Sequence, residues 1–334
     1  MTRIAILGAG IWGTALSLVL SRSPRAHEIS LWVRDAGLAD EIRRKRENLS
    51  YLPGHTLPDQ VHVAHDLDEA LSGTTIVIGA MPSAHAREVY SAAASRIAPR
   101  TAIVSATKGL EPATHARMSE VIAQIVPAAS ARRLAVLSGP SFALEVAHGA
   151  PTAVVLASHD SALAGELQEE FAAPNFRLYT NDDMLGVELA GAMKNVIAIA
   201  AGTCQGLELG SNSLAALITR GLAEMSRLAA TLGARPETLS GLAGLGDLVL
   251  TCTGSLSRNR RVGIELGKGR SLHEIISGMH GVAEGVGTTS ALLALARENK
   301  IDLPITEQVD AILHQGKAPR EAIRAIMERP QRKE

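Results

Sequence analysis

The chain has 334 residues, of which 46% are hydrophobic and 2% aromatic, and it carries 33 basic against 34 acidic side chains. The length suits two domains, and the near-zero net charge excludes the electrostatic footprint of a nucleic-acid or anionic-membrane protein. The cysteines, Cys204 and Cys252, are far apart and the histidines are scattered, so we predict no disulfide framework and no metal site, in a reducing compartment.

The first half of the chain alternates short β-rich runs with helical patterns. The runs that we expect to form strands are residues 3–7, 28–33, 74–80, 101–107, 133–139 and 152–157. This alternation predicts βαβ units and an α/β domain with a parallel-type sheet.

A glycine-rich turn follows the first predicted strand. Gly8, Gly10 and Gly13 form a G-x-G-x-x-G pattern that opens a helical segment. By itself the pattern is also compatible with a turn that binds no ligand. In a βαβ unit, however, such glycines allow a tight turn, close approach to a pyrophosphate and close helix packing. The context therefore predicts a Rossmann-type domain that binds a dinucleotide.

The stretch from Ile4 to Leu20 is uncharged and could be mistaken for a signal peptide. Three glycines interrupt it, and the following SRSPRAHE offers no small-residue cleavage site. It is also short for a membrane span. We therefore expect a soluble, cytoplasmic protein without stable membrane insertion and without a nucleic-acid partner.

The choice of dinucleotide depends on the end of the second predicted strand, where Arg34 precedes Asp35. An acid at this place binds the ribose 2'-hydroxyl of NAD, whereas an arginine accommodates the 2'-phosphate of NADP. Because the arginine comes first, we predict that NADP(H) is favoured and that NAD(H) is also accepted. The alternative is that Arg34 is only a solvated charge at the end of a strand.

After about residue 180 the pattern becomes helical. The predicted helices cover residues 182–204, 213–232, 271–278, 288–299, 306–314 and 320–329. Asn181 and Asp182 offer N-cap groups for the first of them. We therefore predict an NAD(P)-binding Rossmann-like domain at 1–180 and an all-α C-terminal domain, for substrate binding and catalysis, at 181–334.

Lys194 lies in the first long helix of this second half. Its neighbours one and two turns away are apolar or very small: Val187, Ala190, Gly191, Ile197, Ala198 and Ala201. The side chain either extends to solvent or is partly desolvated, which would lower its pKa and let the amine act as a base. Lys108, which follows a predicted strand, is a candidate for a second cation nearby, and its alternative is an ordinary solvated loop lysine.

Residues 242–263 combine an isolated acid, Asp247, with the polar cluster Ser257, Arg258 and Asn259. A guanidinium beside hydroxyl and amide donors suits a phosphate. From the residues alone, a structural loop explains the cluster about equally well.

The chain closely resembles the bacterial-type NAD(P)-dependent glycerol-3-phosphate dehydrogenases, nearly from end to end. The motifs that carry this resemblance are GAGxWGTA from Gly8, RENLSYLPGHTLP (46–58), MPSAHAREV (81–89), ATKGLEP (106–112), LSGPSFALEVAHGAPTAVV (137–155), ELAGAMKNVIAIAAG (188–202), LITRGLAEM (217–225), GLAGLGDLVLTCTGSLSRNRRVG (241–263) and VAEGVGTT (282–289). Several of them are specific to that family.

The resemblance implies a reaction and a set of site residues. Lys194 would exchange the proton at the C2 oxygen between dihydroxyacetone phosphate and sn-glycerol 3-phosphate, while hydride passes between C2 and the nicotinamide. The substrate contacts that it implies are Lys108, Gly139, Ser141, Lys194, Asp247, Ser257, Arg258 and Asn259. The cofactor contacts are Gly8, Gly10, Ile11, Trp12, Gly13, Arg34, Lys108, Ala143, Arg258, Val282 and Glu284. It further implies a homodimer that feeds glycerophospholipid synthesis.

The chain departs from the family pattern at Ile11, Thr203 and Gln205. The family commonly has serine or asparagine at the position of Ile11, so only backbone N–H groups can serve the cofactor there. An acid is more usual at Gln205, and a bulky apolar residue at Thr203. These changes concern specificity and packing more than the reaction.

Two other classes of protein share parts of this pattern. In β-hydroxyacid dehydrogenases an asparagine usually follows the catalytic lysine by four residues, but here that position is Ala198 and the asparagine is the adjacent Asn195. A non-catalytic NAD(P)-binding sensor would keep the glycine turn without needing Lys194, Asp247 and Arg258 together. Both comparisons favour a glycerol-3-phosphate dehydrogenase over the two other classes.

Overall fold

The computed structural model describes residues 1–126, 133–279 and 281–330. The chain divides into two compact units. The first consists of Met1–Glu111 and Ala116–Glu188, and the second of Pro112–His115 and Leu189–Glu334. Each unit is described by itself below.

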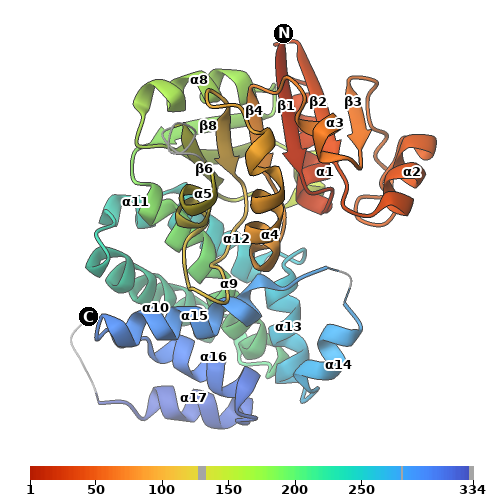
Figure 1. Cartoon of the computed structure of the whole chain (residues 1–334). Coiled ribbons are helices and arrows are strands. Elements are labelled where there is room, and N and C mark those ends of the chain that lie inside the picture. Colours follow the sequence, from red (N-terminus) through yellow and green to blue (C-terminus); the bar gives the residue numbers. More distant parts are fainter. Residues whose placement is uncertain (127–132, 280, 331–334) are drawn as a thin grey trace. The chain divides into compact units, whose positions relative to one another are not determined.

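The first unit is built on one eight-stranded sheet in the order β3-β2-β1-β4-β5-β6-β7-β8 (Figure 1). Its strands are β1 Thr2–Leu7, β2 His27–Trp32, β3 Val61–Ala64, β4 Ile76–Gly79, β5 Ala102–Ser105, β6 Leu134–Ser138, β7 Thr152–Ala157 and β8 Phe176–Asn181. All neighbouring pairs are parallel except β6 and β7, which run antiparallel. The predicted Rossmann-type α/β fold is thus confirmed, with one antiparallel pair that the prediction lacked.

The six predicted strands all exist, but β3 and β8 were missed. These two are the outermost strands of the sheet, so each pairs on one side only. β3 has only four residues, and β8 alternates buried Phe176 and Leu178 with exposed Arg177 and Tyr179. An edge strand needs less continuous apolar sequence than a central one, which weakens its signal.

Helices flank the sheet in the first unit (Figure 1). They are α1 Ile11–Leu20, α2 Ala36–Lys45, α3 Leu67–Leu71, α4 Ser83–Ala93, η1 Ala94–Arg96, α5 Met118–Ile125, α7 Ala143–Ala147 and α8 Ser161–Phe171. α1 is almost wholly buried because nearly all its residues are apolar or small. It approaches β1 so closely that a Cβ on Gly13 would lie 1.9 Å from the Gly8 carbonyl oxygen, so only glycine fits there.

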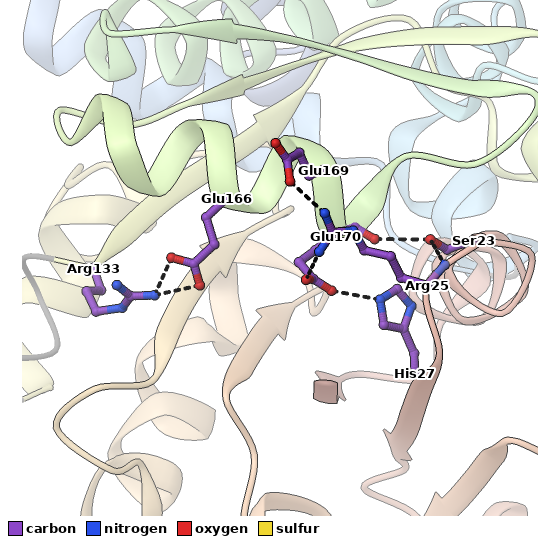
Figure 2. A network of polar contacts seen from close by, with 7 residues as sticks. All are labelled: Ser23, Arg25, His27, Arg133, Glu166, Glu169 and Glu170. Atoms are coloured by element: carbon purple, nitrogen blue, oxygen red, sulfur yellow. Dashed lines mark hydrogen bonds and ion pairs between the residues drawn. The ribbon is translucent and has the colours of Figure 1, made fainter. Parts of the chain in front are cut away.

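A polar network holds α8 against the start of β2 (Figure 2). Glu170 accepts a hydrogen bond from Arg25 Nη1 at 2.9 Å and lies 3.0 Å from Nε2 of His27, whose side chain is buried. The other ring nitrogen of His27 lies 3.1 Å from the Leu20 carbonyl oxygen. His27 begins β2, whereas the glycine turn follows the end of the parallel strand β1. These contacts therefore stabilise the amino-terminal ends of the strands, opposite to the ends where the glycine turn lies.

The second unit is helical in its described residues. Its helices are α9 Met184–Gly206, whose residues up to Glu188 belong to the first unit, α10 Gly210–Thr231, α11 Pro236–Ser240, the π-helical turn η2 Leu242–Gly246, α12 Asp247–Thr253, α13 Arg258–Gly267, α14 Leu272–Ser277, α15 Glu284–Glu298, α16 Pro304–His314 and α17 Pro319–Met327. The predicted all-α second half is confirmed. The prediction missed α11, α12 and α13, which lie in glycine-rich or polar sequence.

The long helix α9 organises this unit. It begins after Asp183, whose carboxylate accepts a hydrogen bond from the Gly186 N–H at 2.9 Å, so the N-cap is one residue later than the predicted pair. It is long and apolar enough to cross a membrane, but 89% of its most apolar window is buried in the protein. Gly202 and Gly263 allow close contact of α9 with α13, since a Cβ on either would lie 1.9 Å from a carbonyl oxygen of the other helix.

Candidate functional site

The glycine turn presents an uncapped helix N-terminus. Gly10 is the N-cap residue of α1 and makes no side-chain cap, and apart from its chain neighbours no described residue lies within 4 Å of where a Cβ on Gly10 would stand. The first N–H groups of a helix carry partial positive charge and lack partners within the helix. This open, donor-rich turn therefore suits the pyrophosphate of a dinucleotide.

The first turn of α1 contributes a further donor. The Trp12 ring packs against the hydrophobic core, and its indole Nε1 is buried without a hydrogen-bond partner among the described residues. A buried donor without a protein partner is what an acceptor on a bound ligand would satisfy. Ile11 beside it is half-buried and offers only its backbone. The turn thus fits the predicted cofactor.

The residues predicted to distinguish NADP from NAD lie after β2. Arg34 is exposed, whereas Asp35 is the N-cap of α2, and its Oδ1 accepts a hydrogen bond from the Leu38 N–H at 2.7 Å. A carboxylate that caps a helix is partly satisfied by that helix. This arrangement favours the arginine as the group that faces a ligand, and the preference for NADP(H) stays a prediction.

Three predicted residues meet at the carboxyl ends of the neighbouring strands β5 and β6. The Lys108 amine lies 2.7 Å from the Gly139 carbonyl oxygen and 3.3 Å from Ser141 Oγ. The Ser141 hydroxyl also donates to the Gly139 carbonyl at 2.9 Å. Ala143, half-buried, begins α7 just beyond. Lys108, Gly139 and Ser141 are called the Lys108 cluster below. Ligands of parallel sheets bind at the carboxyl ends of the strands, so this cluster is a candidate for ligand binding.

In the second unit, Lys194 forms a buried ion pair. Its Nζ lies 2.5 Å from Asp247 Oδ1 and 3.0 Å from Thr251 Oγ1. Both side chains are buried, with 8% of Lys194 and 1% of Asp247 exposed. Burial disfavours the charged amine, while the adjacent carboxylate favours it. The burial of the amine agrees with the desolvated alternative rather than with an extended, solvated side chain, and the carboxylate beside it is an addition that the helical pattern did not indicate.

Thr251 was missed by the analysis of the sequence. Its hydroxyl donates to the Asp247 carbonyl oxygen at 2.6 Å, one turn earlier in α12. The oxygen of that hydroxyl therefore turns its lone pairs to the Lys194 amine. The four-residue spacing from Asp247 is the signal that could have found it, since such residues share a helix face.

Asn259 joins three helices. Its Nδ2 donates to Asn195 Oδ1 on α9 at 2.9 Å, and its Oδ1 accepts from the Gly285 N–H at the start of α15 at 2.9 Å. Both asparagines are buried. The sequence distinguishes Asn195 only by its position directly after Lys194. The network fixes the start of α13 relative to the helix that carries the lysine.

Arg258 is the first residue of α13, directly before Asn259. Ser257 is the buried N-cap of this helix, and its hydroxyl accepts from the Arg260 N–H at 3.2 Å. The exposed Arg258 guanidinium lies against Gly281, since a Cβ there would be 2.6 Å from Nη1. Next along the chain are exposed Val282 and half-buried Glu284. The predicted phosphate arginine and the last predicted cofactor residues are thus brought together.

The structure also bears on two other kinds of chemistry, nucleophilic attack by a cysteine thiol and metal binding. Burial raises the pKa of the Cys252 thiol to about 12 despite the nearby cations Lys194 and Arg260, so this cysteine is not a nucleophile at neutral pH. Within the described ranges there is no group of three or more histidine, cysteine, aspartate or glutamate residues arranged to hold a metal ion. The prediction of a metal-free protein stays a prediction.

Comparison with known proteins identifies the family. The model of the NAD-dependent glycerol-3-phosphate dehydrogenase N-terminus matches residues 3–164, and that of its C-terminus matches residues 183–324. The chain belongs to the NAD-dependent glycerol-3-phosphate dehydrogenase family. The resemblance inferred from the motifs is confirmed.

Relatives of this family match the chain over its whole length. Glycerol-3-phosphate dehydrogenase [NAD(P)+] from Koribacter versatilis is 54% identical over 331 residues, which is 99% of this chain and 98% of the relative. The same-named protein from Acidobacterium capsulatum is 53% identical over 343 residues, with 100% of each covered. The crystal structure of glycerol-3-phosphate dehydrogenase from Coxiella burnetii matches with a TM-score of 0.93 at 44% identity, covering 98% of this chain and 99% of that one.

More distant structures share the fold alone. A D-mandelate dehydrogenase structure matches with a TM-score of 0.64 at 14% identity, covering 96% of this chain and 100% of that one. This likeness concerns the fold alone, and membership of the glycerol-3-phosphate dehydrogenase family rests on the matches above.

Proposed function

We propose that this protein catalyses the NAD(P)H-dependent, reversible reduction of dihydroxyacetone phosphate to sn-glycerol 3-phosphate and so feeds glycerophospholipid biosynthesis. The observation that carries this proposal is the buried pair of Lys194 and Asp247 in a chain of this family. A buried amine held by a carboxylate at 2.5 Å is suited to exchanging a proton with a substrate oxygen.

Lys194 is the proposed acid and base. In reduction its ammonium group donates a proton to the C2 oxygen of the ketone, and in oxidation the neutral amine takes the proton from the C2 hydroxyl. Asp247 favours the protonated amine. Asp247 and Thr251 together fix the position of Nζ through contacts of 2.5 and 3.0 Å. When bound, NAD(P)H supplies the hydride for C2.

The proposed phosphate site is the start of α13. Arg258 offers paired N–H donors, and a guanidinium binds phosphate oxygens with two parallel hydrogen bonds. Ser257 lies beside it, and we assign the second amide hydrogen of Asn259 to the same phosphate. Further substrate contacts are assigned to the Lys108 cluster, in which Gly139 and Ser141 hold the amine in place. Holding the phosphate away from C2 orients the reacting carbon.

The proposed cofactor contacts begin at the glycine turn and also include more distant residues. Gly8, Gly10, Gly13 and the backbone of Ile11 would hold the pyrophosphate, and Trp12 would satisfy its buried indole N–H on the same ligand. Arg34 would bind the 2'-phosphate of NADP(H), with NAD(H) also accepted. The remaining assigned contacts are Lys108, Ala143, Arg258, Val282 and Glu284.

The wider organisation of the enzyme is also proposed here. We assign cofactor binding to residues 1–180 and substrate binding with catalysis to residues 181–334. We further infer a homodimer, because the resemblance implies it, and a cytoplasmic location, because the two distant cysteines indicate a reducing compartment. Sedimentation of the purified protein tests the dimer, and a monomer at micromolar concentration would contradict it.

The function is tested by following oxidation of NADPH and NADH with dihydroxyacetone phosphate and with unphosphorylated dihydroxyacetone. We expect turnover that requires the phosphate and that falls by about 10²–10⁴-fold or more in Lys194→Ala, with NADPH binding retained. The matched control is Lys268→Ala, which breaks an exposed lysine–glutamate pair of 3.0 Å on the surface. Cofactor binding without turnover on either ketone would contradict the proposed reaction.

The same assay tests the choice of cofactor. Arg34→Ala should raise the KM for NADPH more than the KM for NADH, because only NADPH carries the 2'-phosphate. NADH is thus an internal control within one variant. Equal effects on both cofactors would show that Arg34 does not bind the 2'-phosphate.

A further inference from the structure

The loop that follows α2 is closed at its base and reaches the glycine turn. An antiparallel bridge between Glu47 and Thr56 joins its two ends, and the Leu57 N–H donates to the Arg46 carbonyl at 2.6 Å. We call residues 46–57 the closed loop. Its motif is part of the resemblance to the family, but the proposed function assigns no role to it.

Asn48 is the residue of the closed loop that contacts the glycine turn. It is completely buried, and its Nδ2 donates to the Ala9 carbonyl oxygen and to Thr14 Oγ1, each at 2.9 Å. Its Oδ1 accepts from the Tyr51 N–H at 3.2 Å. The donor side of the amide therefore faces acceptors and its acceptor side faces a donor, which sets its orientation.

The contact with Ala9 has a geometric consequence for Gly10. The Ala9 carbonyl and the Gly10 N–H belong to one peptide unit, and no cis peptide bond occurs in the described residues. In a planar trans peptide the C=O and N–H bonds point in opposite directions. By holding the carbonyl, Asn48 turns the Gly10 N–H away from the closed loop.

The same side chain acts on the first turn of α1. Thr14 is fully buried, and its N–H donates to the Gly10 carbonyl at 3.0 Å in the first hydrogen bond of the helix. Asn48 thus holds the peptide before the N-cap and the residue that closes the first turn. An isolated glycine turn has many accessible conformations, since glycine loses more backbone entropy on ordering than other residues. The contacts of Asn48 restrict the glycine turn to one conformation.

We propose that Asn48 is a positioning residue that pre-organises the glycine turn for the pyrophosphate of the cofactor. It does not contact the reacting atoms, and it acts through the Ala9–Gly10 peptide and Thr14. The inference rests on the cofactor binding in the proposed function. Because the pyrophosphate is common to both cofactors, loss of Asn48 affects NADPH and NADH alike.

The test is binding of NADPH and NADH to Asn48→Ala, measured by fluorescence titration without substrate. We expect both Kd values to rise about tenfold or more, by similar factors, because the Ala9 carbonyl loses its strongest donor. In steady-state assays the KM for each cofactor rises, while kcat and the KM for dihydroxyacetone phosphate at saturating cofactor stay near the wild-type values.

A charge variant supplies a second readout. Asn48→Asp keeps the side-chain volume but replaces the donor with an acceptor that faces the Ala9 carbonyl. A protonated aspartic acid has an O–H to donate, so NADPH binding by Asn48→Asp should recover as the pH falls, relative to wild type and to Asn48→Ala. This variant also provides the test if Asn48→Ala does not fold.

The matched control is Asn175→Ala in the same unit. Asn175 also donates to a backbone carbonyl, that of Gly149 at 2.7 Å, but it precedes β8 and lies outside the glycine turn. Its variant should bind both cofactors like wild type. Wild-type affinity in Asn48→Ala, or an effect on NADPH alone, would overturn the inference. Wild-type protein that binds neither cofactor would instead overturn the proposed function.

Discussion

Replacing Asp247 with asparagine removes the negative charge from the buried pair while keeping the volume of the side chain. Only 8% of the Lys194 side chain and 1% of the Asp247 side chain are exposed, so the remaining amine cannot recover its hydration. Removing one charged partner of a buried ion pair lowers the free energy of unfolding by about 3–5 kcal/mol when the remaining charge stays buried. We expect Asp247→Asn to lose stability of this order at acid pH.

The loss of stability should depend on pH. A buried amine without its carboxylate gives up its proton more readily than an amine in the unfolded chain. The unfolded state of the variant then binds more protons than its native state, so its unfolding free energy rises with pH. The deficit relative to wild type is therefore largest at acid pH and shrinks towards alkaline pH.

Catalysis should fall as well, because a lysine that has lost its proton has none to give to the C2 oxygen. We expect kcat for reduction of dihydroxyacetone phosphate to drop by about 10²-fold or more. Urea unfolding at pH 6 and pH 9 measures stability, and NADPH oxidation measures turnover. Asp68→Asn, which breaks an exposed pair with Arg96, is the control and should change neither. A pH-independent deficit in Asp247→Asn would refute the reasoning about the proton.

Arg258→Ala should raise the KM for dihydroxyacetone phosphate by about 10–100-fold, because it removes a charged pair of donors; an unchanged KM in steady-state kinetics would place the phosphate elsewhere. Burial raises the pKa of Glu224 to about 7 despite hydrogen bonds from Ile305 and Thr306. Its contribution to stability is therefore present at acid pH and lost as the pH rises from 4.5 through about 7, by up to about 3 kcal/mol. Urea unfolding at pH 5 and 8 should show this loss in wild type and a flatter profile in Glu224→Gln. Gly263→Ala should destabilise the second unit, since its Cβ would lie 1.9 Å from the Ile199 carbonyl oxygen; an unchanged Tm would contradict this.

Sequence alone predicted the elements whose signals are local. The apolar runs of the central strands, the glycine spacing after β1 and the helical pattern after residue 180 each depend on neighbours within a few residues. The two edge strands escaped notice because edge strands need fewer apolar residues. Helices α12 and α13 were missed because α12 is short and contains Asp, Val, Thr and Cys, and α13 contains two glycines, all residues of low helix propensity. Packing against α9 overrides this propensity.

The contacts of the candidate site were beyond the reach of the sequence. Lys194 meets Asp247 across 53 residues, and Asn48 meets Ala9 across 39. From the residues alone, Lys194 was either solvent-exposed or partly desolvated, with Lys108 as a candidate cation nearby. The family resemblance assigned Lys194 and Asp247 to one substrate site, but not to a direct ion pair. The sequence by itself determined the fold class, the turn for a dinucleotide and the family. Only the tertiary structure decided which charges pair and which peptides are held, because burial and distance depend on how separate elements pack.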